Sequence, residues 1–359
     1  MLINPGFVRL ALITFALCLA QCQQPHVTVA QNIKPLRVLE FADNTPTHQL
    51  PQIGNSAEFT YSADGKKIAA SWIQGIFVFD AKRGKPKSFI KTKTFLTGMQ
   101  FSKDGQIIGG RYGKDIAIAS FWKTRKGKLL TEIKVSQHEN ELGHFAFSPA
   151  TKLAAISDKD EVKIHECESG KLQHTFDLSK NTSQGIRCLT FSPDGKLLAV
   201  ALTTGVYLLN IQDKKIESKI PPTGNLVDRL FYSPDGRYLA STNLLSEGVC
   251  VWEIKSKKLV ARFGEKRSDP NLECVCFSPN SNLIAIGGGQ PDNYGNPYME
   301  VFEFPSKKSV ANLSKFFKFD VVNMQFSPDG KQLAATCVEE TSIRVFDTSK
   351  AFRAAKVQK

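Results

Sequence analysis

The chain has 359 residues, of which 42% are hydrophobic and 23% are charged, a balance that argues against a disordered chain and against a multi-span membrane protein. Its length suits two conventional domains or one repeat architecture, because stacked repeats escape the size limit of a single core. The formal net charge of +13 attracts acidic partners, while the scattered lysines also fit the plainer interpretation of a solvated surface.

The first thirty residues resemble an export signal. They carry one charge, Arg9, followed by the mainly apolar run Leu10–Ala20, which is too short for a membrane span of about twenty residues. A run of this length matches the core of a secretory signal peptide, and Thr28-Val29-Ala30 fits its cleavage site. We therefore predict a signal peptide at residues 1–30 and a secreted or periplasmic mature domain at residues 31–359, with no transmembrane span.

Two other interpretations of this segment stay open. Leu19-Ala20-Gln21-Cys22 resembles a bacterial lipobox, which would anchor the protein to lipid through Cys22, although Gln21 replaces the small residue expected there. The segment could also be an uncleaved N-terminal helix of a cytoplasmic protein.

One phrase recurs seven times along the rest of the chain. Apolar residues lead to an aromatic and a Ser, a turn follows, and a second apolar run begins, as in Leu189-Thr-Phe-Ser-Pro-Asp-Gly-Lys-Leu-Leu-Ala199. Pro, Asp and Gly favour a tight turn, and the flanking runs are typical of buried strands. The aligned aromatics are spaced by 40, 46, 44, 41, 45 and 49 residues and are Tyr61, Phe101, Phe147, Phe191, Tyr232, Phe277 and Phe326.

Each period contains two further strand-like segments. Third strands are predicted at segments such as Ile76–Asp80 and Val249–Trp252, and fourth strands at Gly170–Phe176, Lys257–Phe263 and Lys307–Leu313. Four strands per period of this length indicate the blade of a β-propeller. The seventh period lacks a fourth strand, and Pro35–Phe41 resembles one. We therefore predict an all-β, seven-bladed propeller of four-stranded blades, in which the strand at about residues 35–41 closes the last blade.

The repeated Phe-Ser-Pro-Asp-Gly-Lys-x-Leu-Ala phrase is similar to that of WD-repeat propellers over about residues 33–350. The family's Trp-Asp pair survives only as Phe79-Asp80, Trp252-Glu253 and Phe346-Asp347, and Gly143-His144 is the one instance of its Gly-His pair. The repeats therefore resemble a degenerate, exported bacterial type, which should rely on apolar packing rather than on the family's buried hydrogen-bond network. Propellers of the periplasmic Tol system use a similar phrase and imply the same fold.

Two segments are candidate binding sites. The run Trp122, Lys123, Arg125 and Lys126 lies at a predicted turn of the second blade, where an anionic partner or a solvated turn are the alternatives. Gly287–Tyr298 interrupts the sixth blade between its second and third strands, and its composition suits a recognition loop or an idle insertion. The candidate residues of this loop are Asp292, Asn293, Tyr294, Asn296 and Tyr298.

Motifs for catalysis or metal binding are missing from the sequence. It has no Gly-x-Ser-x-Gly elbow, no phosphate-binding loop and no Cys-x-x-Cys pair. His138 and His144 are six residues apart, a spacing that does not place them on one helix face. Asp158–Glu161 lacks the glycine and distal Glu of a calcium loop. We therefore assign no catalytic residue, metal or cofactor.

Six cysteines remain after residue 30, mostly in strand-like segments where Cys serves as a small buried hydrophobe. The repeat alignment puts Cys250 and Cys274 on neighbouring strands, which makes them the pair to examine for a disulfide.

Three functions follow from these observations. The first is a non-catalytic scaffold that presents rim loops and one face to a protein or peptide, as the resemblance implies. The second is a propeller hydrolase or lyase with a site at the central channel, which a cluster of His and carboxylates at one mouth would favour. The third is binding of an acidic polymer or anionic surface through a basic rim, without specific recognition of nucleic acid.

Overall fold

Seven antiparallel four-stranded sheets account for nearly all regular structure in the computed structural model of the chain. The structure describes residues 35–40, 58–72, 75–112, 118–134, 143–182, 185–222, 226–243, 248–264, 271–289, 296–338, 340 and 342–348. Residues 1–30, including Cys22, and the loop residues Asp292, Asn293 and Tyr294 lie outside this part, so the predictions made for them remain predictions. No helix in the described ranges is long and apolar enough to cross a membrane.

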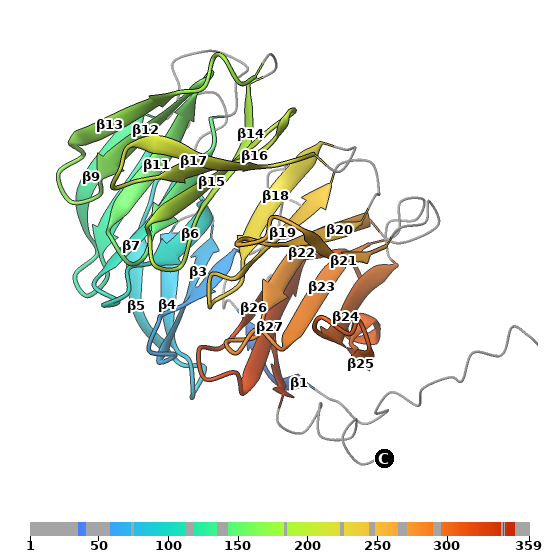
Figure 1. Cartoon of the computed structure of the whole chain (residues 1–359). Helices are drawn as coiled ribbons and strands as arrows, with labels where there is room; N and C mark the ends of the chain where they lie inside the picture. Colours follow the sequence, from blue (N-terminus) through green and yellow to red (C-terminus); the bar gives the residue numbers. More distant parts are fainter. Residues whose placement is uncertain are drawn as a thin grey trace, which may run out of the picture.

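The sheets follow one another along the chain as blades 1 to 7 (Figure 1). Blades 1 to 3 contain β2 Phe59–Tyr61, β3 Lys67–Trp72, β4 Gly75–Asp80, β5 Pro86–Lys91; β6 Thr97–Phe101, β7 Ile107–Tyr112, β8 Ile118–Lys123, β9 Lys128–Lys134; and β10 Phe145–Ser148, β11 Leu153–Asp158, β12 Glu161–Glu166, β13 Leu172–Asp177. Blades 4 and 5 contain β14 Ile186–Phe191, β15 Leu197–Leu202, β16 Gly205–Asn210, β17 Lys215–Ile220; and β18 Val227–Tyr232, β19 Tyr238–Asn243, β20 Val249–Glu253, β21 Leu259–Phe263.

Blade 6 contains β22 Asn271–Phe277, β23 Leu283–Gly289, β24 Pro297–Glu303 and β25 Ser309–Asn312, followed by the short 3-10 helix η2 Ser314–Phe316. Blade 7 contains β26 Val321–Phe326, β27 Gln332–Cys337 and β28 Ser342–Asp347, with β1 Pro35–Glu40 as its outermost strand. The predicted propeller and its N-terminal closing strand are both confirmed. All seven aligned aromatics lie in first strands.

The ring is closed by packing between blades. The first strands of all successive sheets are in contact, including β26 with β2, so these strands surround a central channel. The apolar core consists of seven layers, each built from two neighbouring sheets. A four-stranded sheet has two apolar faces to bury, and only the next blade can cover them.

The turn inside each repeated phrase has a common structure. In six blades the Ser hydroxyl donates to the side chain two residues later, Asp or Asn, at 2.6–2.7 Å, and in all six it also accepts from the backbone N–H five residues later. In blade 3, where Ala150 replaces the acid, Ser148 instead accepts from Thr151. The recurring Ser-Pro-Asp-Gly letters therefore specify a hydrogen-bonded turn.

Two details of the sequence prediction need correction. The fourth strands of blades 3, 5 and 6 begin about two residues later than predicted, because Gly170, Lys257 and Lys307 adopt positive φ angles and belong to the turns. Cys250 and Cys274 are not on neighbouring strands of one sheet. They are unpaired thiols that lie in different blades and in different apolar layers.

Candidate binding site at the mouth of the channel

The two ends of the propeller differ in construction. Because strands alternate in direction within every sheet, all first strands begin at one end, which we call the loop face. The opposite end, the turn face, holds the tight turns that join first to second and third to fourth strands. The loop face surrounds a channel mouth whose ionisable residues come from every blade: Glu58, Arg111, His144, Arg187, Asp228, Arg229, Glu273 and Asp320.

Carboxylates occupy the part of the mouth formed by blades 6, 7 and 1, which we call the acidic arc: Glu273, Asp320 and Glu58. Glu58 directly precedes β2, and its Oε2 accepts a hydrogen bond of 3.3 Å from the backbone N–H of Met99. Burial raises its pKa, and this bond together with Arg229 and Arg111 acts in the opposite direction. Burial also raises the pKa of Glu273, which is raised further by Asp320 and Asp228 and lowered by Arg229.

Arginines dominate the part formed by blades 2 to 5, which we call the basic arc: Arg111, Arg187 and Arg229, with His144 and Asp228 among them. Arg111 lies near the end of β7, and its guanidinium donates to the carbonyl of Gly143 in the next blade. His144 is held by its backbone N–H, which donates to Ser157 Oγ at 2.6 Å. Arg229 forms an ion pair with Asp228, with 3.6 Å between Nε and Oδ2.

Arg229 electrostatically connects the two arcs. It lowers the pKa of Glu58, on blade 1, and that of Glu273, on the adjacent blade 6. One cation of the basic arc therefore acts on carboxylates of two different blades in the acidic arc. Such reach is possible because the first strands converge around a narrow channel.

Asp320 is the least compensated member of the acidic arc. It directly precedes β26, and its pKa is raised by burial without a cation that opposes the shift. Within the residues that the structure describes, its Oδ1 is buried and has no hydrogen-bond partner. A buried carboxylate oxygen in this state favours a donor supplied from elsewhere.

General acid–base catalysis by a histidine paired with a carboxylate would need a different arrangement of the ionisable groups at the mouth. Burial, with Arg111 and Arg187 acting in the same direction, lowers the pKa of His144 to about 4, so the imidazole is neutral at pH 7. The residues that influence its titration are arginines and not the carboxylates of the acidic arc. Among the described residues, no three His, Cys, Asp or Glu side chains form a group able to hold a metal ion. The carboxylates of the acidic arc thus lie apart from the arginines around His144, and none of them influences the pKa of its imidazole.

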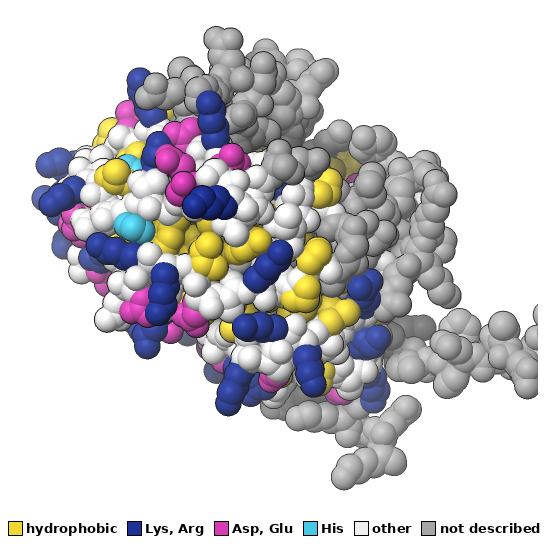
Figure 2. Space-filling view, turned by 45° about the horizontal axis from the view of Figure 1, so that its top comes forward, with side chains coloured by type: hydrophobic (Ala, Val, Ile, Leu, Met, Phe, Trp, Pro, Cys, Tyr) yellow, Lys and Arg dark blue, Asp and Glu magenta, His cyan; other side chains and the backbone are white. Residues whose placement is uncertain are grey.

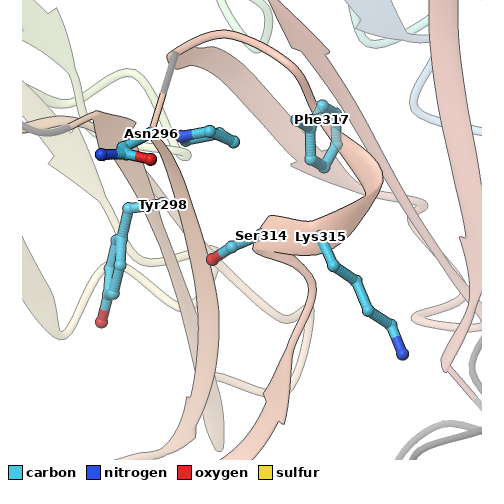
Figure 3. A pocket seen from close by; sticks show the side chains of 6 residues that line it. Asn296, Tyr298, Ser314, Lys315 and Phe317 are labelled. Carbon is cyan, nitrogen blue, oxygen red and sulfur yellow. The ribbon is translucent and has the colours of Figure 1, made fainter. Parts of the chain in front are cut away.

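The predicted loop of blade 6 lies beside an open depression of about 410 Å³. Its described residues Asn296 and Tyr298 line the depression with Pro297, and Ser314, Lys315 and Phe317 line it from the region of η2. Figure 3 shows that the Tyr298 and Lys315 side chains point in different directions. Tyr298 donates to Glu300 Oε2 at 2.8 Å. The depression therefore has mixed polar and apolar walls, and its lining residues form no convergent set of polar groups.

The predicted basic run of blade 2 lies at the turn face. Trp122 ends up inside the layer between blades 1 and 2, where it is 4% exposed, so its ring is unavailable to a surface ligand. Lys123, Arg125 and Lys126 are exposed around the turn between β8 and β9. The run and the loop of blade 6 thus lie at opposite ends of the molecule.

Sequence reasoning did not find the mouth as a site, and it considered His144 only for the Gly-His pair and for its spacing from His138. The residues of the mouth lie far apart along the chain and form no linear motif. A usable signal exists in hindsight, because each acidic or basic residue lies at or near the start of a first strand or the end of a second one. Comparing that position across the seven repeats would have shown them as a set.

The repeats match a family model. The region from residue 145 to residue 233, which spans blade 3, blade 4 and the first strand of blade 5, matches the WD40 domain of anaphase-promoting complex subunit 4. The repeats are of the WD40 type. Propellers with WD40 repeats are typically protein-interaction scaffolds and are generally not enzymes.

Several proteins are similar to this WD40 propeller. WD repeat-containing protein SL1-17 of Schistosoma mansoni is 30% identical over 140 residues, which cover 38% of this chain and 44% of that protein. Meiotic fizzy-related protein 2 of Schizosaccharomyces pombe is 28% identical, over 41% of this chain and 28% of its own length. Apoptotic protease-activating factor 1 of Danio rerio is 25% identical, over 80% and 18%. The chain thus spans less than half the length of these relatives. All three organisms are eukaryotes, and the exported bacterial type stays a prediction.

Proposed function

We propose that this WD40 propeller is a non-catalytic scaffold that binds a protein partner at the loop face, with the channel mouth as the centre of the contact. The observation that carries the proposal is the division of the mouth into an acidic and a basic arc. The segment that binds there would present a cationic side chain to Glu273 and Asp320 and an anionic one to Arg111 and Arg187.

The physical argument rests on desolvation. Carboxylates whose pKa is raised by burial are poorly solvated before any partner arrives. Binding a cation there therefore costs little further desolvation of the carboxylates. Matched charges on a partner would also fix its orientation, because reversing the segment would place like charges together. Following the signal-peptide pattern of residues 1–30, we place this interaction in the periplasm or outside the cell.

A peptide-display selection against the full chain tests the proposal. We expect the enriched peptides to carry both a basic and an acidic residue, and their Kd to be measurable by fluorescence anisotropy. The double variant Glu273→Gln/Asp320→Asn should weaken binding about tenfold or more, because it removes the two charges that face the peptide cation.

The matched control is Asp213→Asn/Glu217→Gln, which removes two exposed charges from the third-to-fourth strand turn and the outer strand of blade 4. It should leave the Kd within about twofold. Melting curves of both variants establish that they are folded. Enriched peptides that bind parent and mouth variant equally, or a failure to enrich any peptide, would overturn the proposal.

A further inference from the structure

The turn face carries most of the net charge of the protein. Thirteen short connections form this face, and they contain 18 Lys and Arg against 7 Asp and Glu. They are residues 62–66, 81–85, 102–106, 124–127, 149–152, 167–171, 192–196, 211–214, 233–237, 254–258, 278–282, 304–308 and 327–331. The excess of eleven positive charges at one end of the molecule compares with +13 for the whole chain.

Most acids of this face already accept hydrogen bonds within their own turns. Asp64, Asp104, Asp194, Asp235 and Asp329 each accept a bond from their turn Ser and from a backbone N–H. Three cations of the face, Lys66, Lys152 and Arg237, form ion pairs with its acids. Five others are exposed, and none of them forms an ion pair with another residue that the structure describes: Arg125, Lys126, Lys255, Lys257 and Lys258. The surface of the turn face is therefore cationic.

The inner turns form a compact ring around the channel. Three of these turns contact a proline in the turn of the preceding blade: Gly65 lies against Pro328, Gly330 against Pro279 and Gly236 against Pro193. A Cβ placed on each glycine would be 3.4–3.8 Å from the proline ring carbons. In these three blades the inner turn thus rests on that of the preceding blade, and the outer turns lie farther from the channel. Cations arranged in two concentric rings match a plane of negative charge better than a single linear polymer, which contacts only the residues along its path.

Exposed aliphatic residues lie next to these cations. Among the residues that the structure describes, five of the six large hydrophobic residues with high exposure lie on the first two residues of fourth strands, directly after a turn that contains at least one Lys or Arg. They come from blades 2 to 5 and are 39–48% exposed: Leu129, Leu172, Ile216, Leu259 and Val260. In Figure 2, hydrophobic side chains gather in the middle of the view among Lys and Arg side chains. Cations beside aliphatic side chains are typical of surfaces that bind the membrane interface.

The chain also enters the propeller at this end. β1 runs antiparallel to β28, and Pro35 pairs with Phe346, the residue before the turn-face end of β28. The residues that precede Pro35 in the sequence therefore connect at the turn face. They include the apolar run Leu10–Ala20 and the lipobox-like Cys22, either of which, if retained, would tether this same face to a bilayer.

We propose that the turn face binds the surface of a membrane rich in anionic phospholipid. Its exposed lysines and arginines neutralise the headgroups, and the aliphatic residues of the outer strands enter the interface between headgroups and acyl chains. Bound in this way, the propeller directs its loop face away from the membrane. The binding does not depend on a partner at the channel mouth, so the two proposals can fail separately.

Vesicle co-sedimentation of the full chain beginning at residue 31 tests this proposal. We expect binding to phosphatidylcholine vesicles that contain about a third phosphatidylglycerol in 0.15 M salt, and little binding to pure phosphatidylcholine. The charge-reversed variant Lys126→Glu/Lys258→Glu should lose about tenfold or more in affinity. The control Lys180→Glu/Lys318→Glu changes the net charge equally at the loop face and should change the affinity less than about threefold.

A second pair of measurements separates lipid from other polyanions. Leu172→Ser/Leu259→Ser should weaken vesicle binding about threefold or more, since lipid contact buries these side chains, and should leave the binding of duplex DNA and of heparin unchanged. An absence of binding to the anionic vesicles would overturn the proposal. Equal losses for the two charge-reversed variants would also overturn it, as would a Leu variant with full vesicle affinity.

Discussion

Gly289 lies directly against the carboxylate of Asp320, so closely that a Cβ at position 289 would be 1.8 Å from Asp320 Oδ1. Gly289 ends β23 and Asp320 precedes β26, so this contact joins blade 6 to blade 7 at the channel mouth. The glycine provides the space in which the partly buried carboxylate of Asp320, with its buried Oδ1, is accommodated.

Gly289→Ala should therefore destabilise the chain by about 1–3 kcal/mol, because the new methyl group displaces the carboxylate. The free energy of unfolding in urea measures this loss. In a double-mutant cycle, Asp320→Ala should recover much of it, since the clash involves the Asp side chain. A Gly289→Ala variant as stable as the parent would show that the contact is loose.

The burial of His144 makes stability depend on pH. Its pKa is lowered to about 4 in the folded chain, so between pH 6.5 and about 4 the unfolded chain binds more protons than the folded one. Stability from this group is thus complete above pH 6.5 and is lost as the pH falls toward 4, by at most about 3 kcal/mol.

His144→Gln should have a shallower decline of unfolding free energy across that window than the parent does. Urea titrations at pH 7.5, 6.5, 5.5 and 4.5 measure the difference between the two proteins. His174→Gln is the comparison: burial and Lys214 also lower the pKa of His174, but this residue lies on the outer strand β13 and is only partly buried, so its substitution should change the decline less. Parallel curves for the parent and His144→Gln would contradict the assignment.

The turn of blade 7 tests the role of the repeated Ser. Ser327 Oγ donates to Asp329 Oδ1 at 2.6 Å and accepts from the Gln332 N–H at 2.9 Å. Ser327→Ala should cost about 1–2 kcal/mol, since both groups lose their partner in a half-buried turn. Ser306→Ala, at an exposed turn with contacts of 3.4–3.5 Å, should stay within about 0.5 kcal/mol. Thermal denaturation of both variants measures the loss of stability. Equal losses would contradict a stabilising role for the repeated Ser.

The closing strand should be required for a monomeric ring. A chain shortened to begin at residue 42 lacks β1 and leaves the backbone of β28 as an unpaired edge. We expect its Tm to fall by about 5 °C or more and larger species to form, as measured by light scattering after size exclusion. The chain that begins at residue 31 retains β1 and should stay monomeric. A shortened chain with unchanged Tm would mean that β1 contributes little.

The repeat phrase alone was sufficient to predict the architecture. Local turn chemistry and strand patterning recur in all seven copies, and a missing fourth strand in the last period indicated where the N-terminal segment belongs. These properties are local or periodic, and periodicity is visible in a single sequence. The placement of Cys250 and Cys274 failed for the corresponding reason. An alignment of repeats gives each residue a strand but does not say which apolar layer its side chain enters.

The amino-acid sequence by itself determined the number of blades, their strands and the way the ring closes, because each depends on residues near one another or on a regular period. Only the tertiary structure decided how charge is distributed. Arg229 acts on both Glu58 and Glu273 because closing the ring brings the first strands together, and scattered lysines become one cationic face because every sheet turns at the same end. Charges act through space, so their joint effect depends on that arrangement and not on their order along the chain.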